Sequence, residues 1–375
     1  MNTQEQQFPS QRLIIPLFIT NRGCPHRCTF CRGIAAENCD PETMTDSVMK
    51  DIVSCYLSTS KPDKKAYTQI AFYGGNFTGL DPHEQDKLLT LAGAFIKTGD
   101  VRSLRISTRP DFLGHDQIIE RLKRAQVKTV EIGAQSMVDE VLDLSCRGHS
   151  SEDVRKAVST LTENGFETGV HLMAGLPGDN RDRFLYSVDE VIRLRPDMVR
   201  IHPTLVFTGT ALADSYERGG YHPLSMDEAV DLCGHALSRF ERAGIPVIRI
   251  GLQPEGDMER PGTILGGPYH PAFRSLVEGK LFFEMASRLL ASMPKNLRQA
   301  NFYVSPKDIS FFRGLNNSNM ERINALTHPV GLTVTADPGQ MRGTLRLVAE
   351  DHRREIHRIP EKVDRRYTDL ECEDV

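Results

Sequence analysis

Three cysteines near the amino terminus constrain this chain more than any other feature. Cys24, Cys28 and Cys31 are separated by three residues and then by two. The run just before them, residues 13–20, is apolar and rich in β-branched side chains, which predicts a strand. The cysteines are therefore expected on a loop that leaves the carboxyl end of a strand, where α/β enzymes place their chemistry.

The chemistry of thiolates limits what this loop can bind. Thiolates are soft ligands that suit zinc or an iron–sulfur cluster. A zinc site of four cysteines would have to recruit Cys39, and the sequence has no second closely spaced pair of the zinc-ribbon type. Buried structural thiols are not expected on a loop that contains Gly, Pro and Arg. The spacing favours a [4Fe–4S] cluster with one iron left open for another ligand.

Composition narrows the class of protein. The 375 residues suffice for one α/β barrel and a smaller appendage, and 39% hydrophobic residues support a sizeable core. A net charge of −4 gives no overall signature of polyanion binding, so a nucleic-acid contact would need a local basic patch. No apolar run reaches the length of a membrane span, and the first residues lack the features of a signal peptide. Eight cysteines are too sparse for a disulfide scaffold, so we expect a reducing cytoplasm.

The middle of the chain alternates short β-like runs with amphipathic segments, which predicts parallel βα units. Strands are expected at 13–20, 67–73, 104–108, 127–132, 168–174, 198–202 and 246–252. Helices are expected near 43–57, 82–97, 115–124, 150–164, 181–194 and 225–243. Six such units predict a partial (β/α)6 TIM-like barrel, whose strand-exit loops converge at one mouth.

The remaining sequence predicts a small α+β extension. We expect an amino-terminal tail at 1–11, the barrel at 12–255, a carboxyl-terminal domain at 256–350 and a charged, flexible tail at 351–375. Residues 257–270 are rich in Gly and Pro and are expected to form a linker or mobile loop. A helix at 271–292 is followed by a strand at 300–304, helices at 307–312 and 319–326, and strands at 331–336 and 344–348. The last two strands are expected to pair around Pro338-Gly339.

Several short motifs follow the predicted strands. Tyr73-Gly-Gly-Asn-Phe-Thr78 ends the second, and its glycines allow a ligand to approach the backbone closely. Ser107-Thr-Arg-Pro-Asp111 leaves the third, where Asp111 is expected to cap the next helix. Gly133-Ala-Gln-Ser136 closes the fourth, and Ser145-Cys-Arg-Gly-His149 comes soon after. Gly175-Leu-Pro-Gly178 follows the fifth.

Together these motifs resemble the radical S-adenosylmethionine (radical SAM) superfamily. Their order along residues 12–255 is similar to the radical SAM part of the catalytic subunit of Elongator, in the short bacterial form without an acetyltransferase domain. Oxygen-independent coproporphyrinogen oxidase shares several of them more distantly. The resemblance implies that Cys24, Cys28 and Cys31 hold a [4Fe–4S] cluster whose fourth iron binds S-adenosylmethionine. One electron would then cleave the cofactor into methionine and a 5′-deoxyadenosyl radical that abstracts a substrate hydrogen.

The resemblance also implies a cofactor pocket. Gly74 and Gly75 would offer carbonyls to the amino group, Arg147 would grip the carboxylate, and Gln135 would bind the ribose or the methionine portion. Thr108 would reach the ribose and Leu176 would pack on adenine. Asn76 stands where the family commonly has an acid, and a neutral amide accepts less strongly from an ammonium group than a carboxylate does.

The substrate has two candidate classes. The Elongator resemblance implies a tRNA nucleoside, and the weaker oxidase resemblance implies a small metabolite such as a porphyrin or an amino-acid derivative. An electron donor such as flavodoxin or ferredoxin is also implied. Basic residues near the carboxyl terminus, including Arg353 and Arg354, are interleaved with aromatic residues such as Tyr303, as in proteins that hold single-stranded RNA. A zinc-stabilised RNA-binding module without redox chemistry is the alternative class.

Overall fold

The computed structural model describes residues 13–19, 22–32, 44–60, 67–252, 258–294, 298–327, 331–349 and 352–358. Cys39, the tail at 1–11 and most of the tail at 351–375 therefore lie outside the described residues. The chain divides into two compact units, Met1–Pro223 with Glu255–Gly267 and Leu224–Pro254 with Pro268–Val375.

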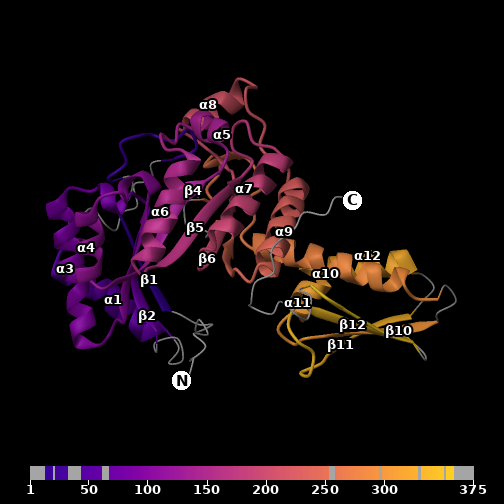
Figure 1. Cartoon of the computed structure of the whole chain (residues 1–375). Coiled ribbons are helices and arrows are strands. Elements are labelled where there is room, and N and C mark those ends of the chain that lie inside the picture. Colours follow the sequence, from indigo (N-terminus) through magenta and orange to yellow (C-terminus); the bar gives the residue numbers. More distant parts are fainter. Residues whose placement is uncertain are drawn as a thin grey trace. The chain divides into compact units, whose positions relative to one another are not determined.

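The first unit is built on a curled parallel sheet, which confirms the partial TIM-like barrel (Figure 1). Its strands lie side by side in chain order: β1 (Leu13–Phe18), β2 (Thr68–Tyr73), β3 (Ser103–Thr108), β4 (Val127–Gln135), β5 (Glu167–Ala174) and β6 (Met198–Pro203). Pro16 fits within β1 because β1 is an edge strand, where a missing N–H breaks no inner ladder. The predicted strands of this unit are confirmed within a few residues.

Helices cover the outer face of this sheet (Figure 1). They are α1 (Asp46–Thr59), α3 (Pro82–Thr98), α4 (Asp116–Arg124), α6 (Ser151–Glu163) and α7 (Arg181–Leu194). N-cap side chains set where three of these helices begin: Asp81 caps α3, Ser150 caps α6 and Asn180 caps α7. The short helices α5 (Asp139–Leu144) and α8 (Ala211–Glu217) were not predicted, because each is too brief for an amphipathic period.

The predicted linker at 257–270 is partly wrong. Its residues Ile264–Gly266 form β9, which pairs antiparallel with β7 (Val206–Phe207). Leu265 packs against a small apolar cluster that includes Val206 and Leu212. Gly267 follows with a φ of +103°, and a Cβ there would lie 2.8 Å from the Thr204 carbonyl oxygen. The glycine that suggested a linker instead permits this close approach.

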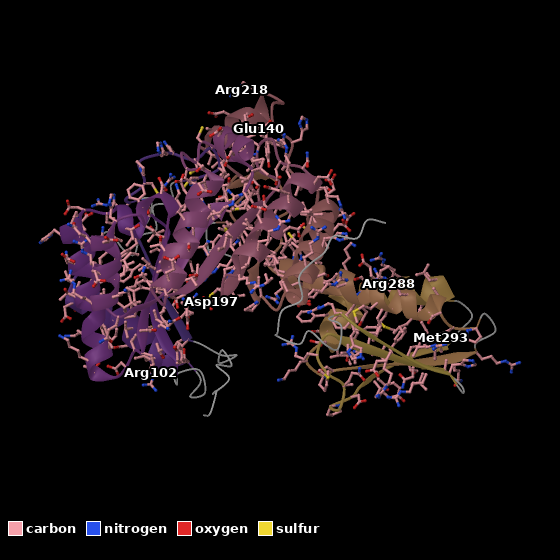
Figure 2. All side chains as sticks on the ribbon, viewed as in Figure 1. Arg102, Glu140, Asp197, Arg218, Arg288 and Met293 are labelled. Carbon is pink, nitrogen blue, oxygen red and sulfur yellow. The ribbon has the colours of Figure 1, made fainter. Side chains whose placement is uncertain are left out.

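Strand direction sets where a site can form in the first unit. Figure 2 shows Arg102 and Asp197, which precede β3 and β6, at one end of the sheet. Glu140, on α5 after β4, lies at the opposite end. All carboxyl ends of the parallel strands therefore open toward the Glu140 end. Among the described residues, none of the helices combines the length and the apolar character that crossing a bilayer requires.

The second unit is a four-stranded sheet with helices. It contains α9 (Met226–Arg242), β8 (Val247–Ile250), α10 (Phe273–Ala291), β10 (Gln299–Val304), α11 (Ile309–Arg313), α12 (Ser318–Thr327), β11 (Gly331–Ala336), β12 (Thr344–Ala349) and β13 (His352–His357). The strand order is β11-β10-β12-β13. The predicted pairing of 331–336 with 344–348 is wrong, because β10 lies between them. Ala300, Phe302 and Val304 are buried, so the central place suits this apolar strand.

Strand β13 corrects the expectation that the flexible tail begins at 351. It pairs antiparallel with β12 as an edge strand, and its charged side chains suit an edge that must stay soluble. Arg358 follows directly and donates hydrogen bonds to Glu278 and, at 2.6 Å, to Glu241 Oε1. Its guanidinium also lies over the Phe282 ring, 5.9 Å from the centroid. One arginine thus anchors the end of the strand between two carboxylates.

We predict that Arg358→Ala destabilises the second unit by about 3–5 kcal/mol, because it leaves two mostly buried carboxylates without their cation. The Arg358 side chain is 12% exposed and that of Glu278 is 3% exposed. The measurement is urea unfolding followed by circular dichroism. Arg353→Ala is the matched control on the same strand: its side chain is 66% exposed and it should cost less than about 0.5 kcal/mol. Equal losses in both variants would contradict the anchoring role.

Candidate functional site

A cavity of about 560 Å³ opens at the carboxyl ends of the strands in the first unit. Eight of the residues singled out in the sequence line it: Cys24, Cys28, Cys31, Gly74, Gly75, Thr108, Gln135 and Arg147. Ser107, Arg109, Gly133 and His171 add further polar surface. Strand exits far apart in sequence thus supply one site. Asn76 and Leu176 are buried and are not among the residues that line it.

The three cysteines lie on one loop and all line the cavity. The Cys31 N–H donates to the Cys28 carbonyl oxygen at 3.1 Å, which closes a turn between the second and third thiols. Within the described part of the chain, no three His, Cys, Asp or Glu side chains are placed to hold a single metal ion.

Close backbone packing fixes the cysteine loop to the end of β2. The Asn76 N–H donates to the Arg22 carbonyl oxygen at 3.0 Å, and the Ile19 N–H donates to the Tyr73 carbonyl oxygen at 2.8 Å. A Cβ on Gly75 would lie 2.4 Å from the Ile19 carbonyl oxygen, and one on Gly23 would lie 2.2 Å from that of Asn76. These glycines are therefore needed for the loop to dock at all.

Asn76 ties the same loop to β3. Its side chain is fully buried, and Nδ2 donates to the Gly23 carbonyl oxygen at 2.7 Å. Its Oδ1 accepts from the Thr108 hydroxyl at 2.6 Å and from the Arg109 N–H at 3.1 Å. A carboxylate at this position could accept from β3 but could not donate to the Gly23 carbonyl. The neutral amide, which stands where the resemblance led us to expect an acid, thus has a structural use.

Arg109 belongs to the motif that follows β3 and lines the cavity as expected, but its pairing with Asp111 was not predicted. Its Nε and Nη2 donate to Asp111 at 3.0 and 2.9 Å, so Asp111 holds this arginine. The predicted helix cap by Asp111 is wrong, since His115 occupies the N-cap of α4 and no side chain caps it. Arg109 lines the cavity, and its buried Nη1 has no hydrogen-bond partner among the described residues. The spacing Arg-x-Asp was the signal available in the sequence.

Arg147 approaches the cysteines from the other side. Its Nη1 lies 3.1 Å from Cys28 Sγ, and its Nη2 donates to the Gly133 carbonyl oxygen at 2.5 Å. Its Nε is buried, and no described residue forms a hydrogen bond with it. His149, two residues on, contacts the Ala134 carbonyl oxygen through Nε2 at 3.2 Å. Burial, helped by Arg147 and Arg109, lowers the pKa of His149 to about 4, so this imidazole is neutral at physiological pH.

Below the cavity lies a buried charged network centred on Glu131. Its carboxylate accepts from Tyr73 Oη at 2.7 Å, from Arg105 Nη1 at 2.6 Å and from Arg200 Nη2 at 2.9 Å, and it contacts His171. Burial alone would raise the pKa of Glu131, but Arg200, His171 and Arg105 together hold it well below its ordinary value. Two arginines face one carboxylate here, so the floor of the site is positively charged.

The Glu131 network was also missed from the sequence. Tyr73, Arg105, Glu131, His171 and Arg200 come from β2, β3, β4, β5 and β6. Arg105, Glu131, His171 and Arg200 each stand between two large aliphatic residues of their strand, which is the pattern that could have revealed the network. His171 connects the network to the site, because it lines the cavity and contacts Glu131.

Comparison with known proteins gives two family matches. Residues 18–191 match the model described as "Radical SAM superfamily", and residues 196–282 match the "Radical_SAM C-terminal domain". Together these segments take in the cysteine loop and the strand exits that line the cavity.

Curated relatives include proteins named tRNA uridine(34) acetyltransferase. The one from Methanocaldococcus jannaschii is 27% identical over 60% of this chain and 48% of its own length. That from Dehalococcoides mccartyi is 37% identical over 53% of this chain and 50% of its own length. Elongator complex protein 3 of Schizosaccharomyces pombe is 27% identical over 48% of this chain and 33% of its own. The chain thus spans half or less of these relatives.

A solved structure shares the fold. The Elp3 protein of Methanocaldococcus infernus, with residues 1–46 deleted, aligns with a TM-score of 0.59 and 24% identity. The alignment covers 74% of this chain and 64% of that one.

We predict that Asn76→Asp lowers the free energy of unfolding by about 1–3 kcal/mol, because it removes the donor to a buried carbonyl and places an anionic oxygen against it. Urea unfolding of the metal-free protein measures the change. Asn301→Asp is the control: its Nδ2 donates to Thr335 Oγ1 at 2.9 Å, and a hydroxyl can turn to donate instead. The control should change stability by less than about 0.5 kcal/mol. Wild-type stability of Asn76→Asp would refute this role of the amide.

Proposed function

Because this chain belongs to the radical SAM superfamily, we propose that Cys24, Cys28 and Cys31 hold a [4Fe–4S] cluster and that the protein cleaves S-adenosylmethionine reductively. The observation that carries the proposal is that the three cysteine side chains line one cavity with Gly74 and Gly75. When bound, the cluster would pass one electron to S-adenosylmethionine, giving methionine and a 5′-deoxyadenosyl radical. An air-sensitive cluster also suits the cytoplasm that the composition predicts.

The size and charge of the cavity support this pair of ligands. Its volume of about 560 Å³ falls within the range of about 300–1,000 Å³ that small-molecule sites occupy. Two buried guanidinium nitrogens, Arg109 Nη1 and Arg147 Nε, lack hydrogen-bond partners within the described structure. Unpaired buried donors are costly unless a ligand satisfies them. A carboxylate, which S-adenosylmethionine carries, would satisfy either nitrogen.

The remaining pocket residues take proposed roles from their positions. Gly74 and Gly75 present backbone to the cavity, and Gln135 presents an amide that can donate and accept. Gln135 has a φ of +71°, a conformation that a residue with a side chain adopts only at a cost, as is common where a ligand is held. The Thr108 hydroxyl is already used by Asn76, so we assign Thr108, Asn76 and the buried Leu176 to holding the wall.

The proposed substrate is a tRNA nucleoside. It rests on the relatives named for tRNA uridine modification and on exposed basic side chains of β13, Arg353 and Arg354. The electron would come from a donor such as flavodoxin or ferredoxin. A small metabolite is the rival substrate class, and a colourless zinc protein is the rival to the enzyme itself.

We predict that Cys24→Ser, Cys28→Ser and Cys31→Ser each abolish the brown cluster after anaerobic reconstitution with iron and sulfide. Serine lacks the soft thiolate that iron–sulfur clusters require. Iron content, visible absorbance and release of 5′-deoxyadenosine from S-adenosylmethionine are measured together. Cys55→Ser, which removes an exposed thiol on α1, is the matched control and should behave as wild type. Zinc bound by wild-type protein, or an intact cluster in all three variants, would contradict the assignment.

We predict that bulk tRNA, and not a small-molecule extract, stimulates cofactor cleavage. Binding of tRNA should weaken with salt and fall about tenfold in Arg353→Glu with Arg354→Glu, because phosphate contacts are lost. Lys50→Glu with Lys156→Glu changes the net charge equally on exposed helices of the first unit and controls for overall charge. Stimulation by the extract alone, or equal weakening in both double variants, would count against the tRNA surface.

A further inference from the structure

Arg147 is a buried cation that faces a sulfur atom instead of a carboxylate. Arg147 is 6% exposed, and none of the acidic side chains in the described part of the chain pairs with it. A buried guanidinium without a counter-charge is costly. Its Nη1 instead lies 3.1 Å from Cys28 Sγ. The geometry therefore suits a negatively charged sulfur at Cys28.

The segment that carries Arg147 is locked onto the cysteine loop. The Thr29 N–H donates to the Ser145 carbonyl oxygen at 3.1 Å, which joins the two segments through their backbones. Gly148 has a φ of +65°, and a Cβ there would lie 2.4 Å from the His26 ring. Within the segment, the Arg147 N–H donates to the Leu142 carbonyl oxygen at 2.9 Å. Arg147 thus has little freedom to leave the sulfur.

A second nitrogen of the guanidinium group, Nη2, further restricts the orientation of the Arg147 side chain. Arg147 Nη2 donates to the Gly133 carbonyl oxygen at 2.5 Å, at the exit of β4. The planar fork is therefore held at two points, one on backbone and one on sulfur. Arg109, another arginine that lines the cavity, instead pairs with Asp111, with 2.9 Å between Nη2 and Oδ2. Arg109 and Arg147 are therefore not equivalent.

We propose that Arg147 raises the reduction potential of the cluster through this hydrogen bond to Cys28 Sγ. The inference rests on the proposed function, because it requires the cluster. In the reaction concerned, one electron from an external reductant converts the [4Fe–4S]²⁺ core to [4Fe–4S]¹⁺, and no proton or bond is exchanged. The added negative charge strengthens the attraction to the guanidinium, so Arg147 stabilises the reduced form more than the oxidised one. Hydrogen bonds to the sulfurs are among the factors that set such potentials.

The test is an anaerobic redox titration of the reconstituted protein without S-adenosylmethionine, followed by electron paramagnetic resonance. Arg147→Met keeps the apolar stem and removes charge and donor. At a fixed potential, its ratio of reduced to oxidised cluster should fall about tenfold, which is about 59 mV for a one-electron couple. Arg147→Lys retains the charge, so the midpoint potential of its cluster should lie between those of Arg147→Met and the wild type. Arg27→Gln, an exposed cation beside Cys28, is the control and should shift the ratio less than twofold.

The outcomes separate this inference from the proposed function. A wild-type protein that forms no cluster overturns the proposed function and this inference with it. A normal cluster whose midpoint potential is unchanged in Arg147→Met overturns only the inference. If Arg147→Met fails to fold or to assemble a cluster, Arg147→Lys decides: a midpoint equal to wild type overturns the inference, and a lower one supports it. An equal shift in Arg27→Gln also overturns it, because any nearby charge would then suffice.

Discussion

The docking of the cysteine loop against the exit of β2 is the constraint on which the site depends. Two glycines, Gly23 and Gly75, allow backbones to approach where any side chain would collide with a carbonyl oxygen. Asn76 then bridges that loop and β3 with one buried amide. Because these contacts lie within the wall, the cavity itself is left to residues that can meet a ligand. Contacts among protein groups therefore position the cysteine loop.

The positive charge around the cavity follows from the arrangement of the parallel strands. Parallel strands bring their carboxyl ends to one edge, so residues from separate βα units converge without being close in sequence. Here they bring Arg109 and Arg147 to the walls, while Arg105 and Arg200 around Glu131 leave the floor positive. A thiolate-ligated cluster and a carboxylate are both anionic. The positive charge of the cavity thus suits a thiolate-ligated cluster and the carboxylate group of S-adenosylmethionine.

Much of this could be predicted from local sequence. The strands, the longer helices and the cysteine loop follow from periodicity, capping residues and spacing, which are local properties. The Glu131 network could not be predicted, because its members belong to strands β2 to β6 and meet only when the sheet curls. The central place of β10, the edge strand β13 and the partnership of Arg109 with Asp111 were missed for related reasons. Tertiary contacts decide which strands pair with one another. They also decide whether Asp111 caps a helix or pairs with Arg109.

The central claim is that three sulfurs leave one iron open to S-adenosylmethionine. The most direct measurement is the electron paramagnetic resonance spectrum of the anaerobically reconstituted, reduced protein before and after the cofactor is added. Binding at the open iron changes its ligand set, so the account predicts that the cluster signal shifts on addition. A complete [4Fe–4S] cluster whose spectrum does not respond to saturating S-adenosylmethionine would contradict it.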